Sequence, residues 1–437
     1  MRNLLALALL AWLAAVPAAL AADRPPNIVL LIVDDLGYAD VGVQGLRGIP
    51  TPHLDTIART GVRLTAGYVA APVCSPSRAA IMTGRYPQRF GIYDNAPTST
   101  SDPRFGLPRG QPTLAERLRA LGYRTALFGK WHLGSPAWQR PNARGFEETL
   151  TFLNSGGHRY FGTPAQPNLL YRGDRVVAEP DYLTFAFARE AVSFIHRSAD
   201  APFFLAVPFS AVHPPQEAPA DYIARFAAIG DKKRRLMAAM LSTLDDATGR
   251  ILAALREEGL ESSTLIFFVS DNGGDPAKNA SRNDPFSGAK GDLLEGGIRV
   301  PFFVRWPGHL PAGAVYDRPV SSLDIAATAL AAAGYRERAV PALDGVDLVP
   351  YLTGRRDGEP HAALYWRYTS LSAPQSGQAA IRSGDYKLLR RGGRDALYDL
   401  ARDPRETRDL AAAQPERADG LRRQLDAWMG GLVPQVQ

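Results

Sequence analysis

The chain has 437 residues, of which 46% are hydrophobic and 22% are charged, and it contains one cysteine. These proportions are ordinary for globular proteins and exclude a disordered chain, and a single cysteine excludes a framework of internal disulfides. The formal net charge of +6 suits an anionic substrate through long-range steering. The basic run at 232–235 is interpreted as a solvated face at the start of a helix, and we expect no nucleic-acid partner.

The first 22 residues have the layout of a secretory signal peptide. Arg2 provides a positive start, residues 4–20 are almost wholly apolar, and residues 19–21 (Ala-Leu-Ala) form a small-x-small cleavage signal. An uncleaved anchor is the alternative, and no later run approaches the roughly 20 apolar residues of a membrane span. We expect an exported bacterial protein, periplasmic or secreted, whose mature chain is soluble and not stably inserted in a membrane.

Four short apolar runs predict strands that are buried on both faces, as in a parallel sheet. They are residues 28–33, 125–128, 203–207 and 265–269. Amphipathic helical patterns at 114–121 and 236–255 alternate with them, the second with an apolar side chain every three or four residues. This alternation predicts an α/β fold with a large, mostly parallel or mixed central sheet flanked by helices.

The chain beyond residue 345 has a different pattern, with short strand-like pieces, glycine turns and a final amphipathic helix. The strand-like pieces are residues 363–366, 379–382, 387–389 and 397–398, and the helix includes Leu421, Leu425 and Trp428. We predict a signal peptide at 1–22, a catalytic domain at 23–345, and a small α+β domain with an antiparallel sheet at 346–437.

Polar side chains follow the four predicted strands, where functional groups gather in open α/β sheets. In chain order they are Asp34 and Asp35, Lys130 and His132, His213, and Asp271 and Asn272. Four oxygen-bearing side chains without a thiolate pair suit a hard divalent cation such as calcium or magnesium. Either acidic pair by itself would equally fit a turn or a helix cap, and their joint occurrence after two strands favours a site.

Five motifs occur together in the first three quarters of the chain. They are Cys74-Ser75-Pro76-Ser77-Arg78, residues 122–134 (GYRTALFGKWHLG), residues 270–274 (SDNGG), Lys290-Gly291, and residues 295–301 (EGGIRVP). In identity and order these motifs resemble those of the type I sulfatases of the alkaline phosphatase-like superfamily. The resemblance spans about residues 27–310, and beyond them the chain is similar to that family's smaller domain only in outline.

The resemblance implies an unusual nucleophile. In this family Cys-x-Pro-x-Arg directs a formylglycine-generating enzyme to oxidise the cysteine to Cα-formylglycine, an aldehyde, so that Cys74 would be its precursor. One hydroxyl of the hydrated aldehyde attacks sulfur and the alcohol leaves, after which deprotonation of the second hydroxyl expels sulfate. A serine has no second hydroxyl, which explains why the chemistry needs this residue.

The resemblance also implies a role for each of the other candidate residues. Calcium, or magnesium, would be held by Asp34, Asp35, Asp271, Asn272 and the modified Cys74. Arg78 would orient the nucleophile. Lys130 and His132 would contact it, with His132 as the base that releases sulfate. His213 and Lys290 would grip the sulfate, one of them would protonate the leaving oxygen, and His158 would line the substrate pocket.

The sequence leaves alternatives open. Relatives in the superfamily that hydrolyse phosphonate monoesters or phosphodiesters use the same aldehyde and metal site, and a non-catalytic homologue that binds sulfated glycans is a third reading. Carbohydrate sulfates are the expected substrates, with aryl and choline esters as further options. The loops expected to choose among them are 90–110, 135–180 and 367–378, and the oligomeric state stays open.

Overall fold

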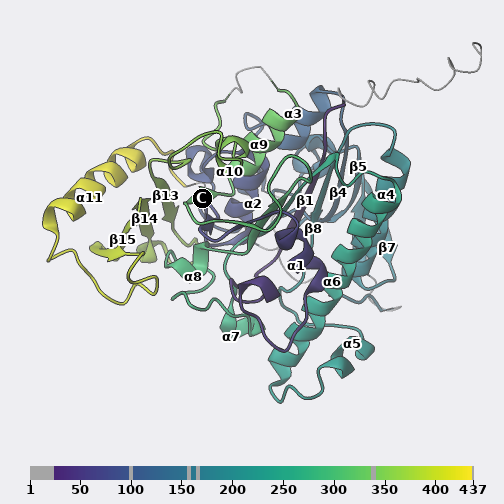
Figure 1. Cartoon of the computed structure of the whole chain (residues 1–437), viewed down its shortest axis with the longest axis horizontal. Coiled ribbons are helices and arrows are strands. Elements are labelled where there is room, and N and C mark those ends of the chain that lie inside the picture. Colours follow the sequence, from purple (N-terminus) through teal and green to yellow (C-terminus); the bar gives the residue numbers. More distant parts are fainter. Residues whose placement is uncertain (1–23, 98–101, 155–158, 164–167, 336–340, 436–437) are drawn as a thin grey trace, which may run out of the picture.

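The structure is a computed structural model that describes residues 24–97, 102–154, 159–163, 168–335 and 341–435. A mixed sheet runs through the larger part of the molecule (Figure 1). In the order in which they lie side by side, its strands are β11 (Ala314–Tyr316), β2 (Val62–Leu64), β10 (Phe302–Arg305), β9 (Thr264–Ser270), β1 (Asn27–Val33), β8 (Phe203–Pro208), β4 (Arg124–Lys130), β5 (Glu148–Phe152), β6 (Asn168–Arg172) and β7 (Arg175–Glu179). The predicted signal peptide and His158 lie outside the described residues.

The four strands predicted from apolar runs are adjacent and parallel, in the order β9-β1-β8-β4. Their carboxyl ends therefore meet at one edge of the sheet, and Val33 at the end of β1 pairs with Ser270 at the end of β9. The strands β6, β7 and β10 run antiparallel to their neighbours, so the sheet is mixed. The predicted α/β fold with a large mixed sheet is confirmed.

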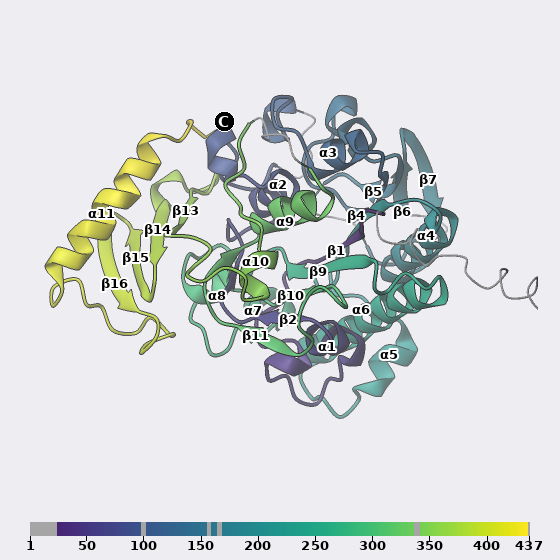
Figure 2. The ribbon, with the colours of Figure 1, turned by 45° about the horizontal axis from the view of Figure 1, so that its top comes forward.

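Helices cover both faces of this sheet (Figure 2). One face carries α1 (Pro52–Arg59), α4 (Leu183–Ser198), α5 (Ala220–Arg225) and α6 (Lys232–Glu257), and the other carries α2 (Cys74–Thr83), α3 (Leu114–Ala120) and α9 (Asp324–Ala332). Strand β1 serves both layers, because its side chains alternate between them. Ile28, Leu30 and Ile32 join the second layer, and Val29 and its i+2 neighbours join the first.

The basic run at 232–235 does begin α6, but it is not simply a solvated face. Asp231 caps this helix by accepting a hydrogen bond from the backbone N–H of Arg234. The side chain of Arg234 then turns inward, with Nη1 2.9 Å from the fully buried carboxylate of Asp40. Arg234 thus pairs with Asp40, which lies 194 residues away in the sequence. The sequence of the run does not predict this pairing.

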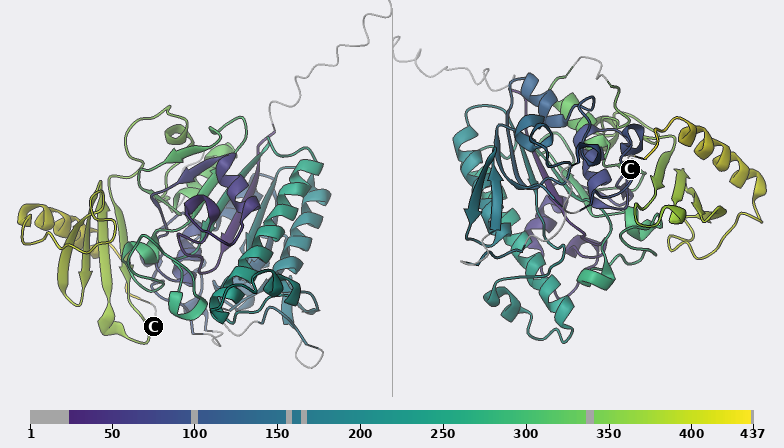
Figure 3. Two further views of the ribbon diagram at one scale, coloured as in Figure 1. Left: turned by 60° about the horizontal axis from the view of Figure 1, so that its bottom comes forward. Right: turned by 180° about the vertical axis from the view of Figure 1, so that it is seen from behind.

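A second, antiparallel sheet lies at the C-terminal side of the molecule, beside the larger part (Figure 3). Its strands are β13 (Leu364–Tyr368), β14 (Gln378–Ser383), β15 (Tyr386–Arg391) and β16 (Arg394–Asp399), and α11 (Pro415–Gly430) packs on one face of it. All four strands and the helix were expected from the sequence. The other face of this sheet packs against the larger part through Trp366, Ala380 and Leu389. The boundary near residue 345 stays a prediction.

The remaining elements are short. They include β3 (Gly67–Tyr68) paired with β12 (Val320–Ser321), the single-turn helices α7 (Pro276–Asn279), α8 (Glu295–Ile298) and α10 (Val349–Leu352), and several 3-10 turns. Among the described residues, none of the helices is both long and apolar enough to cross a bilayer.

Candidate active site

Four oxygen-bearing side chains meet where β1 and β9 end side by side. Asp34 and Asp35 follow β1, Asp271 and Asn272 follow β9, and all four are buried. The backbone N–H of Asp35 donates to Oδ1 of Asp271 at 3.3 Å, and Asn272 Nδ2 donates to Oδ1 of Asp35 at 2.7 Å. The parallel register of the two strands therefore gathers the predicted acidic set into one cluster.

Cys74 is the first residue of α2, and its sulfur faces this cluster. The residues after it suit the start of a helix, because proline in the first turn removes only an N–H that has no partner within the helix. The helix ends at Gly84, which adopts the left-handed φ of 67° that terminates helices. Cys74 Sγ lies 3.4 Å from Oδ1 of Asp34 and is fully buried. The predicted nucleophile precursor thus lies beside the predicted metal ligands.

Arg78 lies one helical turn after Cys74, on the same side of α2. Its Nε and Nη2 lie 2.9 and 2.8 Å from Oδ2 of Asp271, and its Nη2 also lies 3.5 Å from Oδ2 of Asp34. Its Nη1 donates to the backbone carbonyl of Lys130 at 3.1 Å. A single guanidinium thus ties the ends of three strands to the helix that carries Cys74.

Two lysines complete the shell of positive charge. Lys130, the last residue of β4, places Nζ 2.5 Å from Oδ2 of Asp34. Lys290, in the loop before α8, places Nζ 2.8 Å from Oδ1 of Asp35 and 3.3 Å from Cys74 Sγ. The side chain of Lys290 is only 13% exposed and lies at the cluster, where the sequence context rather than the residue type predicted it.

The two histidines after β4 and β8 lie at the same edge. The Nε2 atom of His213 is 3.7 Å from Oδ2 of Asp35, and its Nδ1 lies next to the backbone carbonyl of Pro214. His132 is buried at a positive φ of 58°, and neither of its ring nitrogens has a hydrogen-bond partner among the described residues. Burial lowers the pKa of both imidazoles below the ordinary value, with the charge of Lys130 adding to the effect.

Burial and charge act in opposite directions on the acidic residues. Burial opposes ionisation of Asp34, but the neighbouring cations, with Lys130 foremost, hold the pKa of that carboxyl well below its usual range. Burial and then the negative charge of Asp34 raise the pKa of Asp271 to about 6. Burial likewise raises the pKa of the Cys74 thiol to about 12. Burial therefore disfavours the charged form of Asp271, and a further positive charge at the cluster would favour it.

The donor set fits a hard divalent cation. Ligand atoms of Asp34, Asp35, Cys74 and His213 all lie within 4.8 Å of one another. The Oδ1 atom of Asn272 is buried in the same place and has no hydrogen-bond partner among the described residues. A buried polar atom without a partner is costly, and a cation would satisfy it. Carboxylate and amide oxygens are the ligands that calcium prefers.

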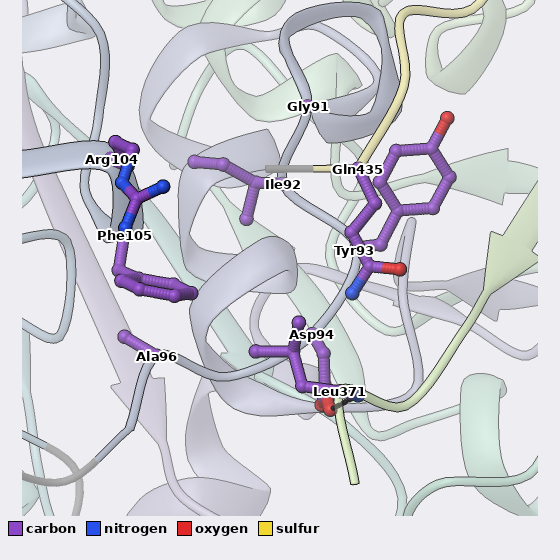
Figure 4. Close-up of a pocket in the computed structure, with 9 residues that line it drawn as sticks. All are labelled: Gly91, Ile92, Tyr93, Asp94, Ala96, Arg104, Phe105, Leu371 and Gln435. Atoms are coloured by element: carbon purple, nitrogen blue, oxygen red, sulfur yellow. Dashed lines mark hydrogen bonds between the residues drawn. The ribbon is translucent and has the colours of Figure 1, made fainter. Parts of the chain in front are cut away.

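Two loop residues reach the site that sequence reasoning did not single out. Asn95 Oδ1 accepts a hydrogen bond from the backbone N–H of Ser75 at 2.8 Å, next to Cys74. Its neighbour Asp94 accepts one from the backbone N–H of Leu371 at 2.8 Å. Figure 4 shows Asp94 and Leu371 together at one side of a small pocket. Asp94 and Asn95 belong to the loop 90–110 and Leu371 to the loop 367–378, two of the loops expected to select the substrate. No sequence motif singles out these residues.

Comparisons with known proteins find matches over most of the chain. The family model described as "Sulfatase" matches residues 26–335, and the model described as "N-sulphoglucosamine sulphohydrolase, C-terminal" matches residues 290–430. N-acetylgalactosamine-6-sulfatase of Sus scrofa is 34% identical over 92% of this chain and 85% of its own. Arylsulfatase A of Homo sapiens is 34% identical over 95% of this chain and 91% of its own. The structure of Ps i-CgsB in complex with k-i-k-neocarrahexaose is 34% identical, with a TM-score of 0.88 over 95% of each chain.

Proposed function

The chain belongs to the sulfatase family and is a sulfuric ester hydrolase, and we propose that it acts on carbohydrate sulfates with a formylglycine derived from Cys74 and a bound calcium ion. One observation supports this proposal most. Cys74 Sγ lies 3.4 Å from Asp34 Oδ1 and 3.3 Å from Lys290 Nζ. An oxygen bonded to Cβ of residue 74 in place of the sulfur would therefore lie next to both a metal ligand and a cation. Modification of Cys74 by a formylglycine-generating enzyme is part of the proposal.

The chemistry of the unmodified thiol supports conversion. With a pKa of about 12, the Cys74 thiol would be ionised in only about one molecule in 10⁵ at neutral pH, and the thiolate is the reactive form. An unmodified thiol at this position is therefore a poor nucleophile. The hydrated aldehyde supplies instead one hydroxyl that attacks sulfur and a second that allows sulfate to be released.

The metal would be held by Asp34, Asp35, Asp271 and Asn272, with Cys74 adjacent. A bound cation at this position makes the nucleophilic hydroxyl more acidic and neutralises charge on the sulfuryl oxygens. Arg78 holds Asp271 through two nitrogens, and its charge partly offsets the burial that raises the pKa of this carboxyl to about 6. Magnesium is the alternative ion.

The remaining cations suit the sulfate group. Lys130 and Lys290 flank the acidic cluster from two sides, and they would donate to the sulfuryl oxygens as the sulfur–oxygen bond breaks. His213 is partly exposed, with 22% of its side chain accessible, and would reach the leaving oxygen of the substrate. His132 has a lowered pKa and free ring nitrogens among the described residues, as a base that takes the proton of the second hydroxyl requires.

The substrate class is proposed from the relatives and from the loops around the site. The relatives include an N-acetylgalactosamine-6-sulfatase and the structure of Ps i-CgsB in complex with k-i-k-neocarrahexaose. The loop of Asn95 contacts Ser75 next to Cys74, and the loop of Leu371 contacts the neighbouring Asp94, so the two loops are candidates for a wall that binds a sugar. We also propose that the chain is exported, on the basis of the N-terminal pattern.

Turnover measurements test the proposal. The purified, converted protein is assayed on nitrophenyl sulfate, a nitrophenyl phosphodiester and a panel of sulfated mono- and oligosaccharides. We expect sulfate release from sugars and a much lower efficiency on the diester. Higher efficiency on the diester would favour the phosphodiesterase alternative, and tight binding of sulfated glycans without turnover by fully converted protein would favour the non-catalytic one. The matched family models favour neither alternative.

A further inference from the structure

The short helix α8 lies beside the C-terminal sheet (Figure 1), and a cluster of buried charged side chains joins the two. Lys387 of β15 lies between two carboxylates, with Nζ 2.9 Å from Oε1 of Glu295 and 2.9 Å from Oε1 of Glu406. All three side chains are fully excluded from solvent at this contact. Buried charges are rare and costly unless they are paired, and pairing alone seldom stabilises a fold more than apolar packing would. A buried triad at this place therefore points to a positional role.

Glu295 is the centre of the cluster. The Tyr68 hydroxyl donates to its Oε2, and Arg299 Nη1 lies 3.3 Å from the same oxygen. Arg382 of β14 reaches the Tyr68 hydroxyl from the C-terminal sheet. Burial opposes ionisation of Glu295, but the cations around it, with Lys387 foremost, lower its pKa to about 2. Glu295 is thus held as a carboxylate by residues of both parts of the molecule.

The cluster grips the backbone as well as side chains. Glu406 Oε2 accepts a hydrogen bond from the backbone N–H of Glu295 at 2.6 Å, so one carboxylate holds both Lys387 and the first residue of α8. The next residue, Gly296, donates its N–H to the carbonyl of Ser287 at 2.7 Å. The loop 287–294 is therefore closed onto α8, and its position depends on where α8 lies.

This loop carries Lys290, and α8 also touches the end of β9. The N–H of Gly273 donates to the carbonyl of Gly297 at 3.0 Å, and the N–H of Lys290 donates to the carbonyl of Gly274 at 3.1 Å. A Cβ on Gly273 would lie 1.9 Å from the carbonyl oxygen of Gly296, which shows how closely the two backbones approach. A shift of α8 would therefore move Lys290 relative to Asn272 and the acidic cluster.

We propose that Lys387 is a positioning residue of the active site, which holds Glu295 and Glu406 together and so aims Lys290 Nζ at Cys74 and Asp35. The path is continuous from the C-terminal sheet to a contact of 3.3 Å with Cys74 Sγ. A second contact of that sheet supports it: Gln378 donates to the carbonyl of Gly291 and accepts from the N–H of Leu293, each at 3.1 Å. The C-terminal sheet thus completes a site whose reacting groups all come from the larger part.

The inference rests on the proposed role of Lys290 in gripping sulfate, and a double-mutant cycle tests it. Lys387→Met removes the charge at similar side-chain length. We expect it to raise KM for nitrophenyl sulfate at least tenfold with a smaller change in kcat, and to weaken the rise in Tm caused by inorganic sulfate. In the background of Lys290→Ala, Lys387→Met is expected to have no further effect on kcat/KM, whereas its effect on Tm persists.

Arg305→Met is the matched control. Arg305 pairs with Glu261 at 3.0 Å and is only 9% exposed, but it faces Ile266 of β9, at the opposite edge of the sheet from the site. This variant should lower Tm while leaving KM and the sulfate-induced rise in Tm unchanged. If Lys387→Met fails to fold, Tyr68→Phe removes one donor to Glu295, keeps the ring, and is expected to show the same non-additivity with Lys290→Ala at smaller magnitude.

The outcomes distinguish failure of the positioning role of Lys387 from failure of the proposed function. If losses in kcat/KM from Lys387→Met and Lys290→Ala simply add, or if Lys290→Ala leaves KM unchanged, the positioning role is overturned even though the wild type is an active sulfatase. If the converted wild type does not hydrolyse sulfate esters, the proposed function fails. The sulfate-induced rise in Tm then still reports whether Lys387 acts through the anion-binding position of Lys290.

Discussion

Arg78 binds Asp271 through two nitrogens that converge on one oxygen, with Nε 2.9 Å and Nη2 2.8 Å from Oδ2, and both side chains are buried. The same guanidinium donates to the backbone of Lys130. One side chain from the helix of Cys74 therefore fixes the relative positions of the ends of β9 and β4. Lys130 in turn contacts Asp34, so the acidic and basic residues of the site form one connected network of contacts.

Replacement of Arg78 by lysine should separate its charge from its geometry. Lysine keeps the positive charge but cannot reproduce the planar fork. We expect kcat/KM to fall by about 10²-fold or more, the size of effect seen when one transition-state donor is lost, and stability to fall by about 1.5–3 kcal/mol as a hydrogen bond between buried charged groups is lost. Nitrophenyl sulfate turnover and urea unfolding measure the two effects.

Conversion must be measured in the same sample, because Arg78 lies within the motif expected to direct modification of Cys74. Peptide mass spectrometry reports the fraction of residue 74 converted, and kcat is divided by that fraction. Wild-type activity per converted Arg78→Lys molecule would contradict the orienting role.

The central sheet was predictable because its strands carry their own signal. Continuous apolar runs such as 28–33 are buried on both faces, and polar candidate site residues follow the runs. Parallel strands end at the same edge of the sheet, so acidic pairs after two such strands predicted a cluster there, and the adjacency of β1 and β9 brings the ends that carry Asp34 and Asp271 side by side. Short strands such as β10, with four residues, have too little pattern to be told from loops.

The parts that could not be predicted depend on partners far away in the sequence. Lys387 lies in a strand whose pattern alone places it on one face, but only the packing of the two sheets brings it to Glu295, 92 residues away. Asn95 likewise contacts Ser75 through a loop without periodicity. Tertiary packing decides such pairs, and single-residue propensities carry no information about them.

The unconverted protein should resist alkylation at Cys74. Its sulfur is fully buried and its pKa of about 12 leaves almost no thiolate at pH 8, so native protein should react with iodoacetamide far more slowly than protein in urea. Mass spectrometry of the peptide that contains residue 74 follows the reaction. Converted protein provides the internal control, because it should resist iodoacetamide even in urea and react instead with a hydrazide. Rapid alkylation of native protein would contradict the buried, protonated thiol.

Removal of the metal should lower both activity and stability. A ligand that binds only the folded state stabilises it by about 2.7 kcal/mol at one hundred times its dissociation constant. We therefore expect chelation to lower Tm by several degrees and to abolish turnover, and added calcium to restore both more effectively than magnesium. The physical cause of this stabilisation is that a bound cation favours the charged form of Asp271, which burial and the charge of Asp34 disfavour.

Asp35→Asn is the matched variant for the metal experiment, since it removes one charged ligand and keeps the side-chain shape. Its Tm should respond much less to chelator and to calcium than that of the wild type. An equal response of the two proteins would place the ion elsewhere in the chain.

The pair formed by His361 and Asp324 should make stability depend on pH away from the active site. His361 Nε2 lies 2.8 and 3.0 Å from the two carboxylate oxygens of Asp324, and its side chain is 9% exposed. Burial opposes protonation, but the carboxylate raises the pKa of His361 above the ordinary value of about 6.5. A raised pKa in the folded state means that the stabilisation is complete below about pH 6.5 and is lost as pH rises through the folded pKa.

His361→Gln should therefore destabilise the protein most on the acidic side. We expect a loss of about 1.5–3 kcal/mol near pH 6, the usual contribution of a hydrogen bond to a charged group, and a smaller loss at pH 9, where the wild-type imidazole is neutral. Urea unfolding of calcium-loaded protein at both pH values measures the difference. His196→Gln is the control, because its pair with Glu258 is exposed, with 40% of the His196 side chain accessible, and should contribute little at either pH. If the loss of stability in His361→Gln instead grows with pH, the folded state lowers the pKa of His361 rather than raising it and holds this side chain neutral.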